Sequence, residues 1–504
     1  DLDVGGKTIT VLNNKDAEEL GVYSLDRVII HTDGDSLTAV VNTSEKFVPQ
    51  GVVAVFDEVR EELALNPGQS VDVEARGPLK SKRYIRHKLE GTELTTEEIR
   101  EIITDVVERN LNDLELAAFI TGISMRGLSI GESTSLIEAM VETGSTLSFG
   151  GMVCDKHSIG GIPGDKTSLL LVPVVAASGL VIPKTSSRAI TSPAGTADRA
   201  GMLMPVELEL SDIEQVVHKT NGCLVWGGSL DLAPADDLLI QIEHPLGVDP
   251  LLLSSILSKK KSAGATHVVI DIPTGSRAKI KTVKEARRLA DQFTQIGKEL
   301  DMVVTCAATF GEQPLGFCIG PALEAREALL AFSSKQSDIK EKVAVLCGVL
   351  FSMVGKVQTF EEGKALADTL LEKKAEDKLR QIIEAQGGDP DITPEDILIG
   401  DCSHRVTAEK KGTVKWINTK ALAAVASAAG CPKDKGAGIT LFKKLGDTVH
   451  QGEPLLEIIA EKSFKLKRAE QVAAENVLIG IIDSWDQSVD VEARGPLKSK
   501  RYIR

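Results

Sequence analysis

The chain has 504 residues, of which 42% are hydrophobic and 26% are charged, and these values predict a globular protein of about two to four domains. The net charge of −15 argues against a general affinity for nucleic acid or an anionic membrane, because phosphate groups attract a basic protein face. We expect no membrane span and no signal peptide, since the sequence shows neither apolar pattern. Its seven scattered cysteines are typical of reduced packing residues in a cytoplasmic protein.

The last residues of the chain repeat an earlier segment. Residues 69–86, QSVDVEARGPLKSKRYIR, recur without change as residues 487–504. Because repeats that arise in evolution diverge, we interpret 487–504 as an artefactual copy of 69–86 and leave it out of the fold prediction.

Short alternating runs rich in valine, isoleucine and aspartate characterise residues 1–86. Examples are residues 26–31 and 52–56, and glycine turns separate such runs. This pattern predicts a small β-rich N-terminal domain. The basic residues at 80–88 then indicate an exposed linker or a charged loop.

The hydrophobic period becomes helical after Leu94, where apolar residues recur on one face of each predicted helix. Each helix is expected to begin at a capping box, in which a polar side chain and a following glutamate satisfy free backbone N–H groups. These helices predict a helical subdomain of residues 87–150, joined by residues near 204–220 and 245–262. We expect their apolar faces to form core, with a dimer surface as the alternative. The capping boxes are Thr95 with Glu98, Asn112 with Glu115, and Ser129 with Glu132.

Strands and helices alternate from Gly150 onward. Residues 267–271 are typical of a buried strand, 282–300 of a helix and 302–305 of the next strand. Such a β-α-β unit predicts a parallel or mixed sheet in an interrupted central α/β domain of residues 151–335.

A final change of pattern follows that domain. A helical stretch at 361–385 and short strands around 438–459 predict a C-terminal α+β domain of residues 336–486. The expected fold class is therefore a multidomain α/β protein with a β-rich N-terminal domain and a helical subdomain.

A glycine-rich segment, DKHSIGGIPGDKT at 155–167, precedes an apolar segment at 168–177 that is predicted to continue as a buried helix. Gly160, Gly161 and Gly164 let backbone N–H groups converge on an anion, and the start of the helix adds favourable partial charge. Further donors are supplied by Lys156, Ser158, Lys166 and Thr167.

This segment fails the P-loop pattern, because Asp165 stands where a glycine should precede the lysine. An ATPase is therefore not favoured. A glycine-rich connection that binds no ligand remains the alternative to an anion site.

A second segment, TSSRAITSPAGTAD at 185–198, follows a strand-like apolar run at 180–183 and opens another predicted helix at Thr196. Two strand-to-helix turns rich in hydroxyl groups and glycines are typical of a site for two anionic groups. Alternatively, these hydroxyl groups only cap helices, as single serine and threonine residues commonly do.

Five motifs in order along residues 90–480 resemble the thymidine and pyrimidine-nucleoside phosphorylase family: DKHSIGG, GDKTS, SSRAITSPAGTADR, LAPADD and SSILSKKKSAGATHVVIDIPTG. Further features resemble the archaeal AMP phosphorylase branch of that family. They are the extra β-rich N-terminal domain, the extra proline-containing residue in GGIPGD, and SSRAITSPAGT in place of a glycine- and histidine-rich version.

The resemblance implies which residues hold the ligands. Arg188 and Lys279 are then candidates to grip the 5′-phosphate of a nucleotide. The implied proton donor is Asp249. The attacking phosphate is placed near Lys156, Ser158, Gly161, Ser168 and Thr196. The nucleotide is placed along Ser187, Arg188, Ala189, Ile190, Thr191 and Ser192, with Ser255 and Lys279 on the other side of the cleft.

From the resemblance we expect phosphorolysis of AMP, and of other nucleoside 5′-monophosphates such as CMP and UMP, to the free base and ribose 1,5-bisphosphate. Phosphate would attack C1′ while Asp249 protonates the leaving base. We expect no cofactor and no metal, because the nucleophile is already an anion. The expected ligands are a nucleotide and phosphate, with no nucleic acid or membrane partner, and the expected assembly is a cytoplasmic homodimer or larger homo-oligomer.

Other functions remain open from the residues themselves. They are phosphorolysis of nucleosides that lack a 5′-phosphate, a phosphoribosyltransferase that needs diphosphate and magnesium, and a non-catalytic nucleotide-binding or assembly protein. For His157, His244 and the Asp236–Asp237 pair, structural roles are favoured over proton transfer or magnesium binding.

Overall fold

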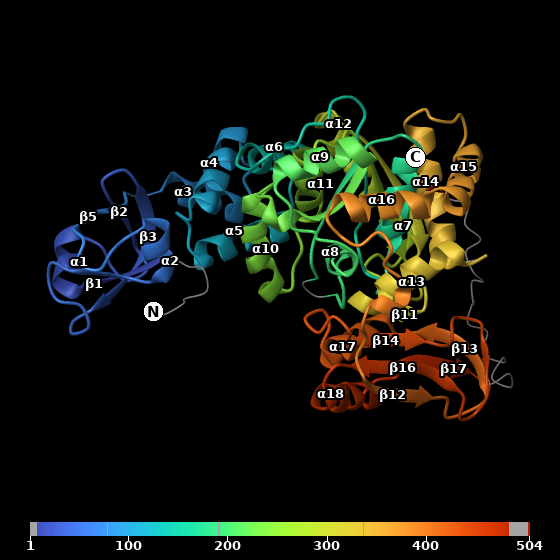
Figure 1. Cartoon of the computed structure of the whole chain (residues 1–504). Coiled ribbons are helices and arrows are strands. Elements are labelled where there is room, and N and C mark those ends of the chain that lie inside the picture. Colours follow the sequence, from blue (N-terminus) through green and yellow to red (C-terminus); the bar gives the residue numbers. More distant parts are fainter. Residues whose placement is uncertain (1–7, 78, 190–191, 336, 483–501, 504) are drawn as a thin grey trace. The chain divides into compact units, whose positions relative to one another are not determined.

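The computed structural model describes residues 8–77, 79–189, 192–335, 337–482 and 502–503 (Figure 1). Its contacts divide the chain into two units, which we call unit 1 (Asp1–Gly144 and Ala233–Ser258) and unit 2 (Ser145–Leu232 and Lys259–Arg504). In the described part of the chain, every helix is too short or too polar to span a bilayer.

A mixed sheet forms the N-terminal part of unit 1, drawn in blue in Figure 1. Its strands are β1 (Ile9–Asn13), β2 (Arg27–His31), β3 (Ser36–Ser44), β4 (Val53–Val55) and β5 (Asp72–Ala75), accompanied by α1 (Asn14–Leu20) and α2 (Asp57–Glu62). The strand order is β4-β1-β3-β2-β5, with β1 and β3 parallel and the other neighbours antiparallel. Val28, Ile30 and Val41 form one core with Ala17 of α1 and Val59 of α2, so the prediction of a β-rich domain is confirmed.

Helices make up the rest of unit 1. They are α3 (Lys80–Glu90), α4 (Thr96–Val107), α5 (Asp113–Arg126), α6 (Ile130–Glu142), α10 (Pro234–Leu246) and the first part of α11 (Leu252–Ser262). The predicted capping boxes are present, since the side chains of Thr95, Asn112 and Ser129 open α4, α5 and α6. The apolar faces of these helices form one buried cluster with α3 and α10, as expected for core.

The basic stretch at 80–88 is a helix and not the linker or loop that its charges indicated. Tyr84, Ile85 and Lys88 are buried along one side of α3. Lys88 pairs with the buried Glu132 of α6 at 2.6 Å, so the positive charge is neutralised inside the subdomain. The prediction was wrong because the acidic partners come from other helices, which the local sequence does not show.

Parallel strands form the centre of unit 2. They are β6 (Cys154–Ser158), β9 (His267–Thr274) and β10 (Val303–Phe310), with β7 (Ile182–Ser186) and β8 (Gly222–Trp226) as a second parallel pair. An isolated parallel bridge between Val153 and Val181 links the two sets. The predicted β-α-β unit is confirmed, with α12 (Val283–Glu299) between β9 and β10.

The outer edge of β10 carries a strand that the sequence did not predict. β18 (Tyr502–Ile503), from the repeated terminal segment, pairs antiparallel with Cys306 and Ala307 of β10. A sheet edge presents unpaired backbone groups that any extended segment can bind, whatever the origin of that segment. The sequence-based fold prediction left residues 487–504 out, and the structure pairs Tyr502 and Ile503 of that segment with the sheet edge.

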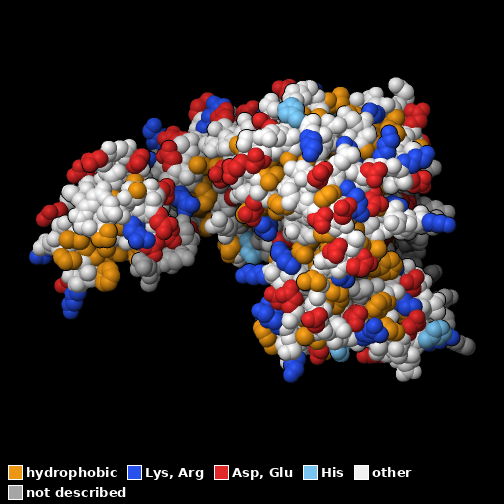
Figure 2. Space-filling model, in the orientation of Figure 1, with side chains coloured by type: hydrophobic (Ala, Val, Ile, Leu, Met, Phe, Trp, Pro, Cys, Tyr) orange, Lys and Arg blue, Asp and Glu red, His pale blue; other side chains and the backbone are white. Residues whose placement is uncertain are grey.

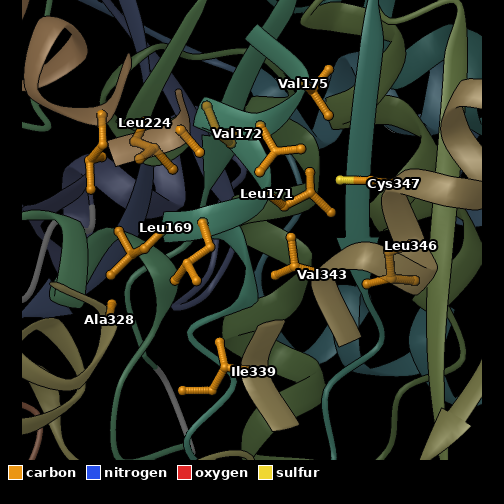
Figure 3. Close-up of a cluster of buried hydrophobic side chains, with 14 of the residues drawn as sticks. Leu169, Leu171, Val172, Val175, Leu224, Ala328, Ile339, Val343, Leu346 and Cys347 are labelled. Atoms are coloured by element: carbon orange, nitrogen blue, oxygen red, sulfur yellow. The ribbon is translucent and has the colours of Figure 1, made fainter. Parts of the chain in front are cut away.

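The apolar helix α7 (Thr167–Ala177) is the centre of the largest core, and its side chains are buried all round. Figure 3 shows Leu169, Leu171, Val172 and Val175 among side chains from other elements of this core. Packed around α7 are α14 (Asp338–Met353), α15 (Phe360–Lys373) and α16 (Ala375–Ala385), and the same core includes α8 (Thr196–Ala200) and α13 (Pro321–Ser333).

These contacts move the expected domain boundaries. The helices at 338–385 belong to the core of α7 and not to a C-terminal domain that begins at 336. Likewise, α9 (Leu210–Thr220) packs on β8 and α16 in unit 2, so residues 204–220 do not join the helical subdomain. Helical periodicity predicts which face of a helix is buried, but it does not identify the element that covers that face.

The C-terminal part of unit 2 has two small sheets. One has the order β11-β14-β16-β12 and the other β15-β13-β17. Two helices, α17 (Thr419–Ala429) and α18 (Ser463–Ala474), complete its core. The strands are β11 (Cys318–Ile319), β12 (Cys402–Thr407), β13 (Gly412–Ile417), β14 (Gly438–Leu441), β15 (Thr448–Val449), β16 (Pro454–Ala460) and β17 (Ile479–Ile482).

Charges of both signs are intermingled on the surface. On the face that Figure 2 shows, lysine and arginine side chains lie among aspartate and glutamate instead of gathering in one area. This face has none of the continuous basic surface that binding to a nucleic-acid backbone requires.

Candidate active site

Segments with polar side chains follow three parallel strands of unit 2. Two of them are named here after the ligands that the family resemblance implies: the phosphate loop (residues 159–166) follows β6, and the nucleotide loop (187–189 and 192–195) follows β7. Residues 275–281 follow β9. β6 runs parallel to β9, and the bridge between Val153 and Val181 is also parallel. The carboxyl ends of these strands therefore lie at the same edge, and the three segments leave the strands there. In open α/β folds, ligands bind at that edge.

Glycines determine the conformation of the phosphate loop. Gly160, Gly161 and Gly164 have φ angles of 78°, 97° and 79°, in the left-handed region that favours glycine. A Cβ on Gly161 would lie 2.7 Å from the backbone nitrogen of Lys279, and one on Gly164 would lie 2.7 Å from the carbonyl oxygen of Leu315. The loop is therefore tightly packed against the segment after β9, which brings Gly161 and Lys279 together.

The predicted hydroxyl ligands lie at the ends of this loop and of the next one. Ser158 is the last residue of β6, and Ser168 lies in the first turn of the buried helix α7. Thr196 is the first residue of α8. Free backbone N–H groups in the first turn of a helix favour an anion, so the position of Ser168 fits a phosphate ligand.

The candidate phosphate lysine, Lys156, is one of four charged side chains that lie close together. Lys156 of β6 lies 3.6 Å from Asp165 and 3.9 Å from Asp271, while Lys342 of α14 lies 2.7 Å from Asp271 and 3.5 Å from Asp165. Burial lowers the pKa of Lys156. Burial opposes the charge of Lys342 as well, but the two aspartates outweigh this and raise its pKa. The cluster is thus neutral, with Lys342 the more tightly paired cation.

The nucleotide loop is closed on itself by a buried carboxylate. Asp198 accepts the backbone N–H groups of Ala189 at 2.7 Å and Gly195 at 2.9 Å. Arg188 is 36% exposed, donates to Glu207 at 2.5 Å, and lies over the ring of Trp226 with 4.8 Å between its Cζ and the ring centroid. Ile190 and Thr191, which the resemblance assigns to the nucleotide, lie outside the described residues.

Arg199 connects the phosphate loop with the nucleotide loop. Its guanidinium group donates to the carbonyl oxygen of Asp165 in the first loop and, at 2.7 Å, to that of Ala194 in the second. Glu324 of α13 pairs with the same guanidinium at 2.9 Å. The positions of the two loops are therefore coupled through one buried side chain.

Lys279 and Ser255, which the resemblance places together on the other side of the cleft, belong to different units. Lys279 is part of unit 2, next to Gly161. In unit 1, the hydroxyl group of Ser255 donates to the buried Asp236 at 2.8 Å. Asp236 and Asp237 lie in the first turn of α10, in agreement with the structural role favoured for them.

Asp249 lies between α10 and α11 of unit 1 and is solvent-exposed there. A carboxylic acid that protonates a leaving base must be shielded from water. The described residues of unit 1 by themselves do not give Asp249 that shielding.

The other face of β6 carries a second buried charge cluster. Asp155 pairs with Lys260 at 2.7 Å and with Lys184 at 3.4 Å. Burial lowers the pKa of Lys184 from 10.5 to about 7. Burial and the neighbouring lysines also hold the pKa of His157 well below 6.5, so this imidazole is neutral near pH 7 and is not a general acid.

Stability should therefore rise as the pH increases from about 7 toward the ordinary lysine value of 10.5. The folded chain releases the Lys184 proton near pH 7, whereas the unfolded chain keeps it, so unfolding takes up a proton throughout this window. Urea unfolding midpoints at about pH 7 and pH 9 measure the rise. Lys184→Met should reduce it and the exposed-site variant Lys433→Met should not; an equal rise in Lys184→Met would contradict the assignment.

Several residues that shape this site were not singled out from the sequence. Asp165 was noted only as the residue that breaks the P-loop pattern, and Asp198 and Arg199 only as part of a motif. No sequence signal indicates Asp271 or Lys342, because they come from distant elements. No group of three or more histidine, cysteine, aspartate or glutamate side chains suited to a metal ion occurs among the described residues.

Family models match most of this architecture. Residues 82–144 match the helical bundle domain of a glycosyl transferase family, and residues 150–375 match the a/b domain of that family. Residues 413–480 match the pyrimidine nucleoside phosphorylase C-terminal domain. The fold and the site thus define an enzyme of the glycosyl transferase class.

Curated relatives narrow this class. The chain is 46% identical to the AMP phosphorylase of Thermofilum pendens, over 93% of this chain and 92% of that protein. It is 45% identical to the AMP phosphorylase of Thermococcus kodakarensis, over 92% of this chain and 93% of that protein. The chain belongs to the AMP phosphorylase family.

A solved structure supports the fold. Anthranilate phosphoribosyltransferase from Thermus thermophilus aligns with a TM-score of 0.52 at 20% identity, over 60% of this chain and 98% of that one. At this identity the likeness concerns the fold alone. It agrees with the predicted multidomain α/β class.

Proposed function

We propose that the chain catalyses the phosphorolysis of AMP to adenine and ribose 1,5-bisphosphate. The observation that carries this proposal is a pair of loops at strand carboxyl ends of unit 2, each of which has a cationic side chain in it or beside it. Lys156 lies beside the phosphate loop, and Arg188 lies in the nucleotide loop. Two anions, inorganic phosphate and the 5′-phosphate of the nucleotide, match two such positions.

The chemistry follows from the charges that develop in the reaction. Breaking the bond between C1′ and the base builds positive charge on the ribose and negative charge on the base. Phosphate held at Lys156, Ser158 and Ser168 forms the new bond to C1′, and the bond to the base breaks. Asp249 gives its proton to the departing base. No cofactor is required, because phosphate is itself the nucleophile.

We further propose that CMP and UMP are substrates, as the family resemblance implies, and that the enzyme works as a cytoplasmic homodimer or larger homo-oligomer. All seven cysteines are free of disulfides, which is usual in reducing compartments. Gel filtration with light scattering tests the assembly, and a monomeric enzyme with full activity would contradict it.

The decisive assay incubates the chain with phosphate and AMP, CMP, UMP or the matching nucleosides, and measures free base and sugar phosphate. We expect base release from nucleotides that depends on phosphate and persists in EDTA. Activity on adenosine but not on AMP would instead indicate a nucleoside phosphorylase. A requirement for magnesium and diphosphate would indicate a phosphoribosyltransferase, and no base release would leave a binding protein.

Arg188→Met should distinguish the two kinds of substrate. Loss of a charged partner of the 5′-phosphate should raise the KM for AMP by about 10- to 100-fold. The KM for phosphate should change little, and Arg287→Met on the exposed side of α12 serves as the control. If AMP binds Arg188→Met as well as the unmodified enzyme, Arg188 does not contact the nucleotide.

A further inference from the structure

Asp198 closes the nucleotide loop with one of its carboxylate oxygens. This side chain is 2% exposed, and its Oδ2 atom accepts the N–H groups of Ala189 at 2.7 Å and Gly195 at 2.9 Å. These donors stand near opposite ends of the nucleotide loop. A Cβ on Gly195 would lie 2.5 Å from the carbonyl oxygen of Ser187, so the ends are packed together closely. The shape of the loop therefore depends on Asp198.

The other oxygen of Asp198 faces two cations. Lys435 donates from its Nζ atom to Oδ1 at 3.0 Å, whereas Nη1 of Arg188 lies 3.7 Å from the same oxygen. Only the lysine is within hydrogen-bond distance. Arg188 is instead paired with Glu207, whose side chain is 58% exposed, and it lies over Trp226. The guanidinium group of Arg188 thus stays beside the loop without a hydrogen bond to the buried carboxylate of Asp198.

Lys435 reaches this position from the C-terminal part of unit 2, between α17 and β14. Its backbone carbonyl accepts the N–H group of Ala322 in α13 at 3.0 Å. The next residue, Gly436, donates to Glu461 at 2.7 Å. The C-terminal fold therefore fixes where the ammonium group can reach. Arg188, Asp198 and Lys435 line one pocket, so the three charges share one environment.

We propose that Lys435 is a positioning residue for the nucleotide: by occupying Oδ1 of Asp198, it keeps Arg188 available to the nucleotide's 5′-phosphate. This inference rests on the proposed function. Without Lys435, attraction to the buried carboxylate draws the guanidinium of Arg188 across the short gap to Oδ1. Arg188 then pairs with Asp198 in place of the substrate. The C-terminal part of unit 2 thereby contributes to nucleotide affinity through a residue that need not touch the substrate.

The test compares Lys435→Met, Lys435→Arg and the control Lys433→Met, which replaces an exposed lysine two positions away. Because the side chain of Lys435 is 39% exposed, methionine is tolerated there. We expect Lys435→Met to raise the KM for AMP about fivefold, with kcat and the KM for phosphate nearly unchanged. Lys435→Arg should restore the KM, since it keeps the cation. A lower kcat in Lys435→Met without a higher KM for AMP would instead indicate a general structural role and overturn the proposal.

Two further measurements do not depend on turnover. Calorimetry gives the Kd for AMP, which should rise in Lys435→Met and not in Lys433→Met. Hydrogen exchange reports the protection of the Ala189 and Gly195 amides, and this protection should fall in Lys435→Met and not in Lys433→Met. If no variant releases base but the Kd and exchange shift as expected, the proposed function fails and the positioning role stands. If the two variants match in Kd and exchange, the positioning role is overturned even when the enzyme is active.

Discussion

Lys156→Met should lower kcat/KM for phosphate by about 10²- to 10³-fold, as the loss of one charged donor at an anion site does. Lys156 is 2% exposed, yet it lies 3.6 Å from Asp165 and 3.9 Å from Asp271, whereas Lys342 lies 2.7 Å from Asp271. Lys156 is therefore the less tightly paired of two buried cations. An entering phosphate dianion can pair with its ammonium group in place of the two aspartates. Kinetics with varied phosphate at saturating AMP measure the effect.

Lys184→Met is a matched control for that experiment. It also removes a buried lysine, but the partner of Lys184 is Asp155, on the other face of β6. Phosphate affinity should also decline when the pH is raised and Lys156 loses its proton. Because burial lowers the pKa of Lys156, this decline should begin at a lower pH than it would for a lysine with an ordinary pKa. Equal phosphate affinities in the two variants would mean that the phosphate is bound elsewhere.

Asp249→Asn should lower kcat by about 10²- to 10⁴-fold while leaving the Kd for AMP nearly unchanged, since an amide cannot supply the proton that general acid catalysis needs. The defect should depend on the leaving group. A nucleotide with an N7-methylated purine carries a positive base that departs uncharged without a proton. Its turnover should therefore be similar in Asp249→Asn and in the unmodified enzyme.

Asp113→Asn is the control for this second variant, because Asp113 is an exposed aspartate at the start of α5 in the same unit. It should leave turnover of both substrates unchanged. Unaltered AMP turnover in Asp249→Asn would remove Asp249 as the acid. A slow reaction with both substrates would show that the side chain acts in some other way than by giving a proton.

Local patterns predicted local structure well. The capping boxes at Thr95, Asn112 and Ser129 begin helices, and the apolar segment after the phosphate loop is the buried helix α7. These signals are short-range, since a cap and its helix lie within one turn of each other. The prediction failed for 80–88, where the charges that indicated a linker are neutralised by Glu115 and Glu132 from other helices.

The candidate site shows the same difference between short-range features, which the sequence predicted, and contacts between distant elements, which it did not. The glycines of the phosphate loop were recognised in the sequence, and their left-handed φ angles give the physical reason for them. The side chains that fix the loops were not recognised, because Lys342 and Lys435 are far along the chain from the aspartates that they neutralise. A lysine far from its partner looks like a solvated surface residue until the fold brings the two together.

By itself, the sequence determined the family, the helix starts, the glycine-rich loops and the residue types suited to two anions. Each of these features depends on residues that lie close together along the chain, in short motifs. Only the tertiary structure decided that the helices at 338–385 cover α7, that Arg199 couples the two loops, and that Asp198 is shared by Arg188 and Lys435. The physical reason is that burial and charge neutralisation depend on which distant elements meet, and neither periodicity nor spacing along the chain encodes that meeting.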